Sequence, residues 1–151
     1  MKNSFLTIAL GAIATNAAWA GTYEWTSGWG QGITENMIDD GNGNTLNISC
    51  PGEDEEESDV RAYASIAGKE YSSKDDSGGF DVIVDGKTYS NPFETNCNAC
   101  ASIFPGFWKA LRNANNLQIS ANGKTVNLPT KNIKKTLLPL DSKQNSCRMT
   151  W

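Results

Sequence analysis

Two cysteines are spaced for redox chemistry. Cys97 and Cys100 form a CxxC pattern, in which a thiolate of lowered pKa can exchange disulfides. A pattern typical of a helix follows Cys100, but we find no parallel βαβ pattern around it, and redox CxxC motifs usually occur in one. The chain has no histidine, which excludes imidazole-assisted nucleophiles and His-ligated zinc. A thiol–disulfide oxidoreductase that uses Cys97 and Cys100 is therefore kept as an alternative function.

Structural disulfides are the other use of the four cysteines. Their number is even, which in an exported chain indicates two bridges, and three pairings are possible. We favour Cys97–Cys100 as a local bridge and Cys50–Cys147 as a long one, because the C-terminal part of the chain gains most from being tied down. A zinc site is less consistent with the sequence, because neither Cys50 nor Cys147 belongs to a second CxxC. We expect no metal and no cofactor.

An acidic run packs six carboxylates into seven positions. Mutual repulsion keeps such a run extended and solvated. We interpret it as a loop that aids solubility, as a docking surface for a basic partner protein, or as a site of loose Ca²⁺ capture. No pair of carboxylates elsewhere lies in surroundings that would raise the pKa of one and not of the other, as acid–base catalysis by such a pair requires. We therefore predict no catalytic residue and a protein that is not an enzyme. The residues of the run are Glu53, Asp54, Glu55, Glu56, Glu57 and Asp59.

Two tryptophans are candidates for binding. Most aromatic side chains of a small β domain belong to its core. Trp25 and Trp29 are the best candidates for exposure, because glycines surround Trp29 in the stretch Gly28–Gly32 and a glycine-rich loop buries a large side chain poorly. We predict that Trp25 and Trp29 contribute to a recognition surface.

The first twenty residues have the features of a secretory signal peptide. Lys2 provides the positive start, Phe5–Ala14 is apolar, and Ala18-Trp19-Ala20 precedes Gly21 as a cleavage site would. The apolar stretch is too short to span a bilayer. We therefore expect residues 1–20 to be removed, leaving a single disulfide-stabilised domain over residues 21–151, without a membrane span, in the periplasm or outside the cell. The net charge of −4 argues against a nucleic-acid partner.

Most of the remaining pattern is typical of strands. Apolar residues alternate with polar ones, as in strands with one buried face. Turn residues separate the strands in pairs, at Asp40–Asn44, Asp85-Gly86 and Asn122-Gly123, which predicts three hairpins. The predicted strands are Thr22–Trp29, Ile33–Asp39, Thr45–Cys50, Val60–Ala67, Phe80–Val84, Lys87–Tyr89, Leu117–Ser120 and Lys124–Leu128.

Two segments have helical patterns. Ala101–Asn115 gathers Phe104, Phe107, Trp108 and Leu111 on one face, and Lys131–Leu138 predicts a shorter helix that ends before a proline. Together with the strands they predict a mainly β fold. We expect an antiparallel β-sandwich or flattened barrel, with one main covering helix and a short C-terminal helix.

The second half of the chain resembles a known family, the invasion-associated locus B proteins, which are exported by bacteria. The likeness spans about Phe80–Leu140 and implies a secreted or periplasmic β-rich domain with disulfides and without an established catalytic site. It implies no functional residue. The segments that carry it, in this order, are Val84–Gly86, Asn91–Phe93, Cys97–Ala101, Leu111–Ile119, Gly123–Pro129 and Leu137–Leu140.

These observations predict a binding protein. We expect an exported, non-enzymatic protein-recognition module of the bacterial envelope, whose partner is another protein of the envelope or the exterior. One concrete version is an inhibitor or immunity-type binder of a cationic protein, which would meet the acidic run. The alternatives are the oxidoreductase named above and a structural component of an envelope or secretion assembly, joined through exposed strand edges.

Overall fold

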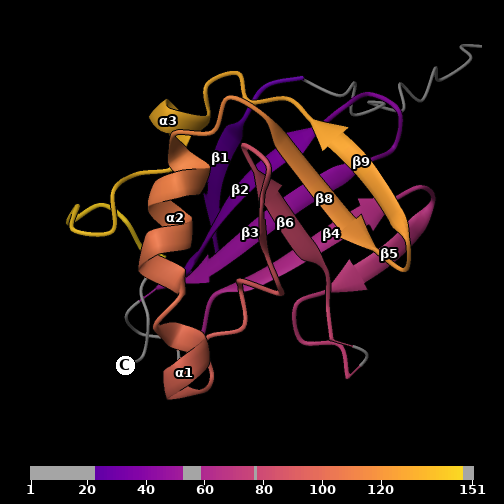
Figure 1. Cartoon of the computed structure of the whole chain (residues 1–151). Coiled ribbons are helices and arrows are strands. Elements are labelled where there is room, and N and C mark those ends of the chain that lie inside the picture. The colour runs from indigo at the N-terminus through magenta and orange to yellow at the C-terminus, as the bar shows by residue number, and fades with distance from the viewer. Residues whose placement is uncertain (1–22, 53–58, 77, 148–151) are drawn as a thin grey trace, which may run out of the picture.

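Five antiparallel strands form the first sheet, in the order β1-β2-β3-β4-β5 (Figure 1). The computed structural model describes residues 23–52, 59–76 and 78–147. Each strand of this sheet pairs with its neighbour in sequence, so the sheet is a meander with β1 and β5 at its edges. The bounds are β1 Thr26–Gly30, β2 Ile33–Asp39, β3 Thr45–Pro51, β4 Arg61–Ile66 and β5 Lys69–Ser72.

The second sheet has four antiparallel strands in the order β7-β6-β8-β9. Its edge strands are β7 and β9. The helices α1 and α2 lie in the connection between β7 and β8, and α3 follows β9. The bounds are β6 Asp81–Val84, β7 Lys87–Tyr89, β8 Leu117–Ala121, β9 Lys124–Leu128, α1 Asn98–Ala101, α2 Phe104–Arg112 and α3 Ile133–Thr136.

Two-residue turns ending in glycine close four of the hairpins in the part of the chain that the structure describes. Both residues of each turn have positive φ, as in the type I′ turn whose twist matches that of paired strands. The predicted hairpins at Asp85-Gly86 and Asn122-Gly123 are confirmed, and so is the one at Asp40–Asn44. The other two turns are Gln31-Gly32 and Ala67-Gly68.

The inner faces of both sheets and one face of α2 share a single hydrophobic core. In β3, Leu46, Ile48 and Cys50 are buried and alternate with partly exposed residues, as the sequence predicts. Figure 1 shows the second sheet lying over the first, with α2 along one side of the two layers. The predicted mainly β class, with one main covering helix and a short helix after the last strand, is therefore confirmed.

The covering helix is bent, although the sequence predicts one continuous helix over Ala101–Asn115. α1 ends at Ala101 and α2 begins at Phe104. Pro105 explains the break, because it has no N–H to donate to the carbonyl of Ala101 and its ring crowds that carbonyl. The four predicted core residues of this segment are all buried in α2, namely Phe104, Phe107, Trp108 and Leu111.

The sequence did not predict β5. Its residues Lys69 and Glu70 are exposed, and only Tyr71 turns into the core. The turn before it, Ala67-Gly68, lacks the Asn or Asp that usually precedes glycine in such turns. Backbone pairing with β4 makes this segment a strand, although its own sequence does not predict one.

Candidate functional site

An open strand edge is the main feature of the candidate recognition site. β1 pairs with β2 on one side only, and among the described strands none pairs with its other side. All five of its residues, Thr26–Gly30, are exposed. An unpaired edge presents backbone N–H and C=O groups to any extended chain that approaches it.

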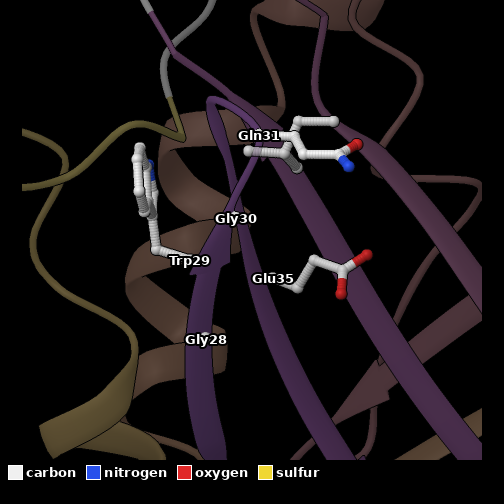
Figure 2. Close-up of a pocket in the computed structure, with 6 residues that line it drawn as sticks. Gly28, Trp29, Gly30, Gln31 and Glu35 are labelled. Carbon is white, nitrogen blue, oxygen red and sulfur yellow. The ribbon is translucent and has the colours of Figure 1, made fainter.

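Trp29 is the large side chain on this edge. It is 78% exposed, the highest exposed fraction among the large hydrophobic residues that the structure describes. Its neighbours in β1 are Gly28 and Gly30, whose Cβ directions lie on the opposite face of the strand. Figure 2 shows the indole on one side of the β1–β2 hairpin, whereas the side chains of Gln31 and Glu35 point to the other side. The exposure predicted for Trp29 is confirmed.

A shallow pocket lies on the hairpin around these residues. It has a volume of about 380 Å³ and is lined by both polar and apolar groups. A Cβ built on Gly28 or Gly30 would meet no atom within 4 Å, so the space above the two glycines is open. The lining residues are Gly28, Trp29, Gly30, Gln31, Ile33 and Glu35 (Figure 2).

A close backbone contact holds the tip of this hairpin. The N–H of Gly52 donates a hydrogen bond to the carbonyl of Gly32, at 2.7 Å. A Cβ at position 52 would lie 2.8 Å from the same oxygen, so a side chain there would push the two segments apart. The Gln31-Gly32 turn is thereby fixed against the end of β3, and Trp29 projects from a braced hairpin.

Trp25 does not belong to the exposed surface, and its predicted exposure is wrong. Its side chain is only 2% exposed. The indole Nε1 donates to the carbonyl of Pro129 at 3.1 Å, and the backbone N–H donates to the carbonyl of Lys131 at 2.9 Å. The carbonyl of Trp25 accepts a bond from the Thr136 hydroxyl at 3.1 Å. Trp25 is thus a core residue that fixes the start of β1, and Trp29 is the binding candidate that remains.

The acidic run lies largely outside the described residues, which include only Asp59 of its six carboxylates. The carboxylate of Asp59 pairs with the Lys74 ammonium at 3.3 Å, and both side chains are partly buried. Asp59 therefore forms a structural ion pair just before the start of β4. The predicted docking role stays a prediction for Glu53, Asp54, Glu55, Glu56 and Glu57.

The two favoured disulfides are both formed. Cys50–Cys147 joins β3 to the last described residue, and both cysteines are buried. Cys97–Cys100 lies at the start of α1, where both cysteines are partly exposed. The Cys97 sulfur also accepts the N–H of Cys100 at 3.0 Å and caps the helix. The two bridges therefore differ in their access to solvent.

A second candidate surface is basic, and the sequence reasoning did not identify it. A groove of about 410 Å³ runs between α2 and the segment 139–141, and Lys109 and Arg112 line its helix side. The signal was present in the sequence, because Asp141 is the only acidic residue after Glu94, whereas basic residues recur there. The net charge alone hides this separation of charge along the chain.

Two further kinds of feature are absent from the described part of the chain. No group of three or more His, Cys, Asp and Glu side chains among the described residues is placed to hold a metal ion. No helix within residues 23–52, 59–76 and 78–147 is long and apolar enough to cross a membrane.

Comparisons with known proteins place this chain in a family. Over 119 residues it is 29% identical to the Uncharacterized protein YfjT of Escherichia coli strain K12, and the match covers 75% of this chain and 77% of that protein. No solved structure matches the chain. The resemblance to the invasion-associated locus B family stays a prediction. A family model named YfjT matches residues 23–137, which is most of the chain and nearly all of the described fold. The chain therefore belongs to the YfjT family.

Proposed function

We propose that the protein is an exported, non-enzymatic protein-recognition module of the bacterial envelope, which binds an extended segment of its partner along the edge of β1. Paired cysteines support export, because disulfides persist in oxidising compartments. The leader-like pattern of residues 1–20 agrees with this, although those residues lie outside the described part of the chain.

The exposure of β1 is the observation that carries the proposal. Proteins commonly protect an edge strand with charge, proline or a covering segment. β1 has the sequence TSGWG, which contains none of the charges or prolines that block strand addition, and every residue in it is exposed. An added strand would gain backbone hydrogen bonds along β1, as in other cases of β-augmentation.

Trp29 would supply the side-chain energy of this interface. Tryptophan is enriched among the residues that dominate binding energy, because it buries a large area with little loss of rotamer freedom. The open space above Gly28 and Gly30, on the face of the hairpin opposite the indole, would let a partner approach β1 closely from that side. The braced Gln31-Gly32 turn reduces the ordering cost of binding.

Cross-linking on intact cells followed by mass spectrometry tests this proposal. We expect Trp29→Ala and Gly28→Lys each to reduce the yield of a specific cross-linked partner, since one removes the indole and the other adds a charge to the edge. Thr88→Lys is the matched control, because Thr88 is exposed on β7, an edge strand of the other sheet. A partner that tolerates Trp29→Ala and Gly28→Lys as well as it tolerates Thr88→Lys would show that β1 is not the interface.

The acidic run defines a specific version of this function. In it the protein is an inhibitor or immunity-type binder, and the carboxylates of residues 53–57 meet a cationic partner. We expect partner recovery from envelope extract to fall at high salt and on replacement of Glu55, Glu56 and Glu57 by alanine. A partner that is indifferent to both changes would exclude the acidic-run version while leaving the β1 proposal in place.

A thiol–disulfide oxidoreductase is the second candidate function. The partial exposure of Cys97 and Cys100, together with the helix-capping bond to the Cys97 sulfur, favours it over a purely internal bridge. Against it stands the fully antiparallel pairing of the described strands, which differs from the βαβ setting of such enzymes. Thiol trapping across a redox titration decides between them: a strongly reducing potential without a reactive thiolate excludes the oxidoreductase.

A structural role in an envelope or secretion assembly is the third candidate. The same open edge of β1 supports it, since strand addition also joins subunits of assemblies. Isolation as a stoichiometric complex with envelope components favours this role, whereas a monodisperse monomer with a separable partner favours the recognition module.

A further inference from the structure

The basic groove is built from a regular stripe of α2. Pro105, Trp108, Lys109 and Arg112 recur at helical spacing, so they line one face, and Pro139–Asp141 forms the opposite wall. The stripe offers two cations at its rim and apolar atoms at its base, where Trp108 is only 1% exposed. These elements are distinct from β1 and its hairpin, so the groove is a second surface with different chemistry.

Hydrogen bonds fix the shape of the groove before any ligand arrives. The indole Nε1 of Trp108 donates to the carbonyl of Leu138 at 2.8 Å. Asn145 donates through Nδ2 to the carbonyls of Leu138 and Pro139, at 2.9 and 3.1 Å. These hydrogen bonds connect α2 to the segment 138–139 and that segment to Asn145. The two walls of the groove are therefore already ordered before a ligand binds.

Arg112 is held in position by hydrogen bonds that use only some of its N–H donors. Its Nε donates to the carbonyl of Leu137, and its Nη2 lies 3.5 Å from the carbonyl of Lys134. A guanidinium has five N–H donors, so further donors remain for a ligand in the groove. A guanidinium that is fixed in this way suits a planar carboxylate, which it can bind with two parallel hydrogen bonds.

The charges around the groove are mainly positive. Lys109 is exposed beside Arg112, and Lys134 and Lys135 are exposed on the neighbouring helix α3. Among the described residues that line the groove, Asp141 is the only one with a carboxylate. A ligand that complements this surface carries negative charge and an apolar group that reaches the accessible apolar atoms of Pro105, Pro139 and Leu140.

We propose that this groove binds an acidic segment of a partner protein, with carboxylates on Lys109 and Arg112 and an apolar side chain against Pro105 and Leu140. The concave shape favours a peptide over a membrane surface. Apolar atoms at the base of a groove cannot insert into a flat bilayer, whereas a peptide side chain can enter the groove.

Chemical-shift mapping on the full chain tests the proposal. The protein is isotopically labelled, the probe is a short unlabelled peptide of alternating glutamate and leucine, and the control peptides replace its glutamates by glutamine or by lysine. We expect salt-dependent shifts at Lys109, Arg112, Leu140 and the indole N–H of Trp108 with the acidic peptide, and none with the lysine peptide.

Charge variants make the test specific to the groove. Lys109→Glu should weaken binding about two- to fivefold or more, and Asp141→Asn should strengthen it, because the first removes an attraction and the second a repulsion. Lys124→Glu is the matched control, since Lys124 is exposed on the β8–β9 hairpin and the change in net charge is the same. All three positions are exposed, so we expect the variants to fold.

Three outcomes would overturn the proposal. Equal weakening by Lys109→Glu and Lys124→Glu would mean that only net charge matters. Shifts centred on β1 would assign the peptide to the other surface. Binding to phosphatidylglycerol vesicles without binding to the acidic peptide would identify the groove as a lipid site. None of these outcomes bears on the Trp29 cross-link, so the two proposals can fail separately.

Discussion

Two tryptophans four positions apart have opposite surroundings. Trp25 precedes β1 and is fixed by hydrogen bonds to the segment between β9 and the end of α3, while Trp29 projects from the open edge. Their residue type is the same, and both belong to one aromatic-rich stretch, Tyr23–Trp29. The difference arises from partners more than a hundred positions away, which a local pattern cannot contain.

Alanine at these two positions should have very different effects on stability. Trp25→Ala removes a buried indole and leaves the Pro129 carbonyl without its partner, so we expect a loss of about 3–5 kcal/mol in the free energy of unfolding. Trp29→Ala should change it by no more than about 0.5 kcal/mol, because the side chain is exposed. Urea denaturation of the two variants measures both values, and equal losses would contradict the assigned environments.

The carboxylate of Asp40 makes the stability of the protein depend on pH through the turn that it caps. Burial on its own would raise the pKa of Asp40, but the side chain of Asn44 and the backbone N–H groups of Asn42 and Asn44 donate hydrogen bonds to the carboxylate and lower it below 3.8 overall. A carboxylate with a lowered pKa in the folded state stabilises the fold above its unfolded pKa. The contribution is lost as the pH falls through the folded-state pKa.

Asp40→Ala should therefore destabilise the protein at neutral pH, by an amount that stays constant down to about pH 5. Below that the difference from the wild type should shrink, and it should approach zero at a pH under the folded-state pKa. Denaturant midpoints measured across this range provide the test. A difference that persists in acid would mean that the ionised carboxylate is not responsible.

At the scale of elements, glycine has opposite roles in a turn and in a helix. Gly123 has a φ of +74° in the β8–β9 turn, where a Cβ is strained, whereas a Cβ added to Gly106 inside α2 would meet nothing within 4 Å. We expect Gly123→Ala to destabilise by about 1 kcal/mol and Gly106→Ala to stabilise by about 0.5–1 kcal/mol. Thermal denaturation of the pair should shift in opposite directions, and a common direction would contradict the helix or the turn assignment.

At the scale of the whole molecule, the two disulfides should contribute unequally to stability. Cys50–Cys147 spans 97 positions and Cys97–Cys100 spans three. Chain-entropy arguments give about 4–5 kcal/mol for the long loop and about 2 kcal/mol for the short one. Replacing both cysteines of the long bridge by alanine should therefore lower the denaturant midpoint more than replacing those of the short bridge.

The order of reduction gives a second measurement of the same difference. Cys97 and Cys100 are partly exposed and Cys50 and Cys147 are buried, so dithiothreitol in native buffer should open the short bridge first. Timed alkylation with mass mapping follows each pair. Simultaneous opening would indicate that global unfolding, rather than local access, controls both bridges.

Much of the fold follows from local patterns. The alternation in Thr45–Cys50 and Val60–Ala67 and the glycine turns at positions 86 and 123 depend on residues that are close in sequence, and those elements are present with nearly the predicted bounds. The same reasoning missed β5, whose polar residues are ordered by pairing with β4. It also predicted a continuous helix over Ala101–Asn115, because it did not allow for the effect of Pro105 on the carbonyl of Ala101.

Residue type and short spacing were enough to predict most of the secondary structure of this protein, and the lack of histidine excludes imidazole catalysis. The folded arrangement was needed to show which tryptophan is buried, which strand lies at a sheet edge, and which cations of α2 face the segment 139–141. Burial and edge position depend on contacts between segments far apart in the chain, and a local pattern does not contain them. Such contacts are fixed only when the two sheets and the helix close around one core.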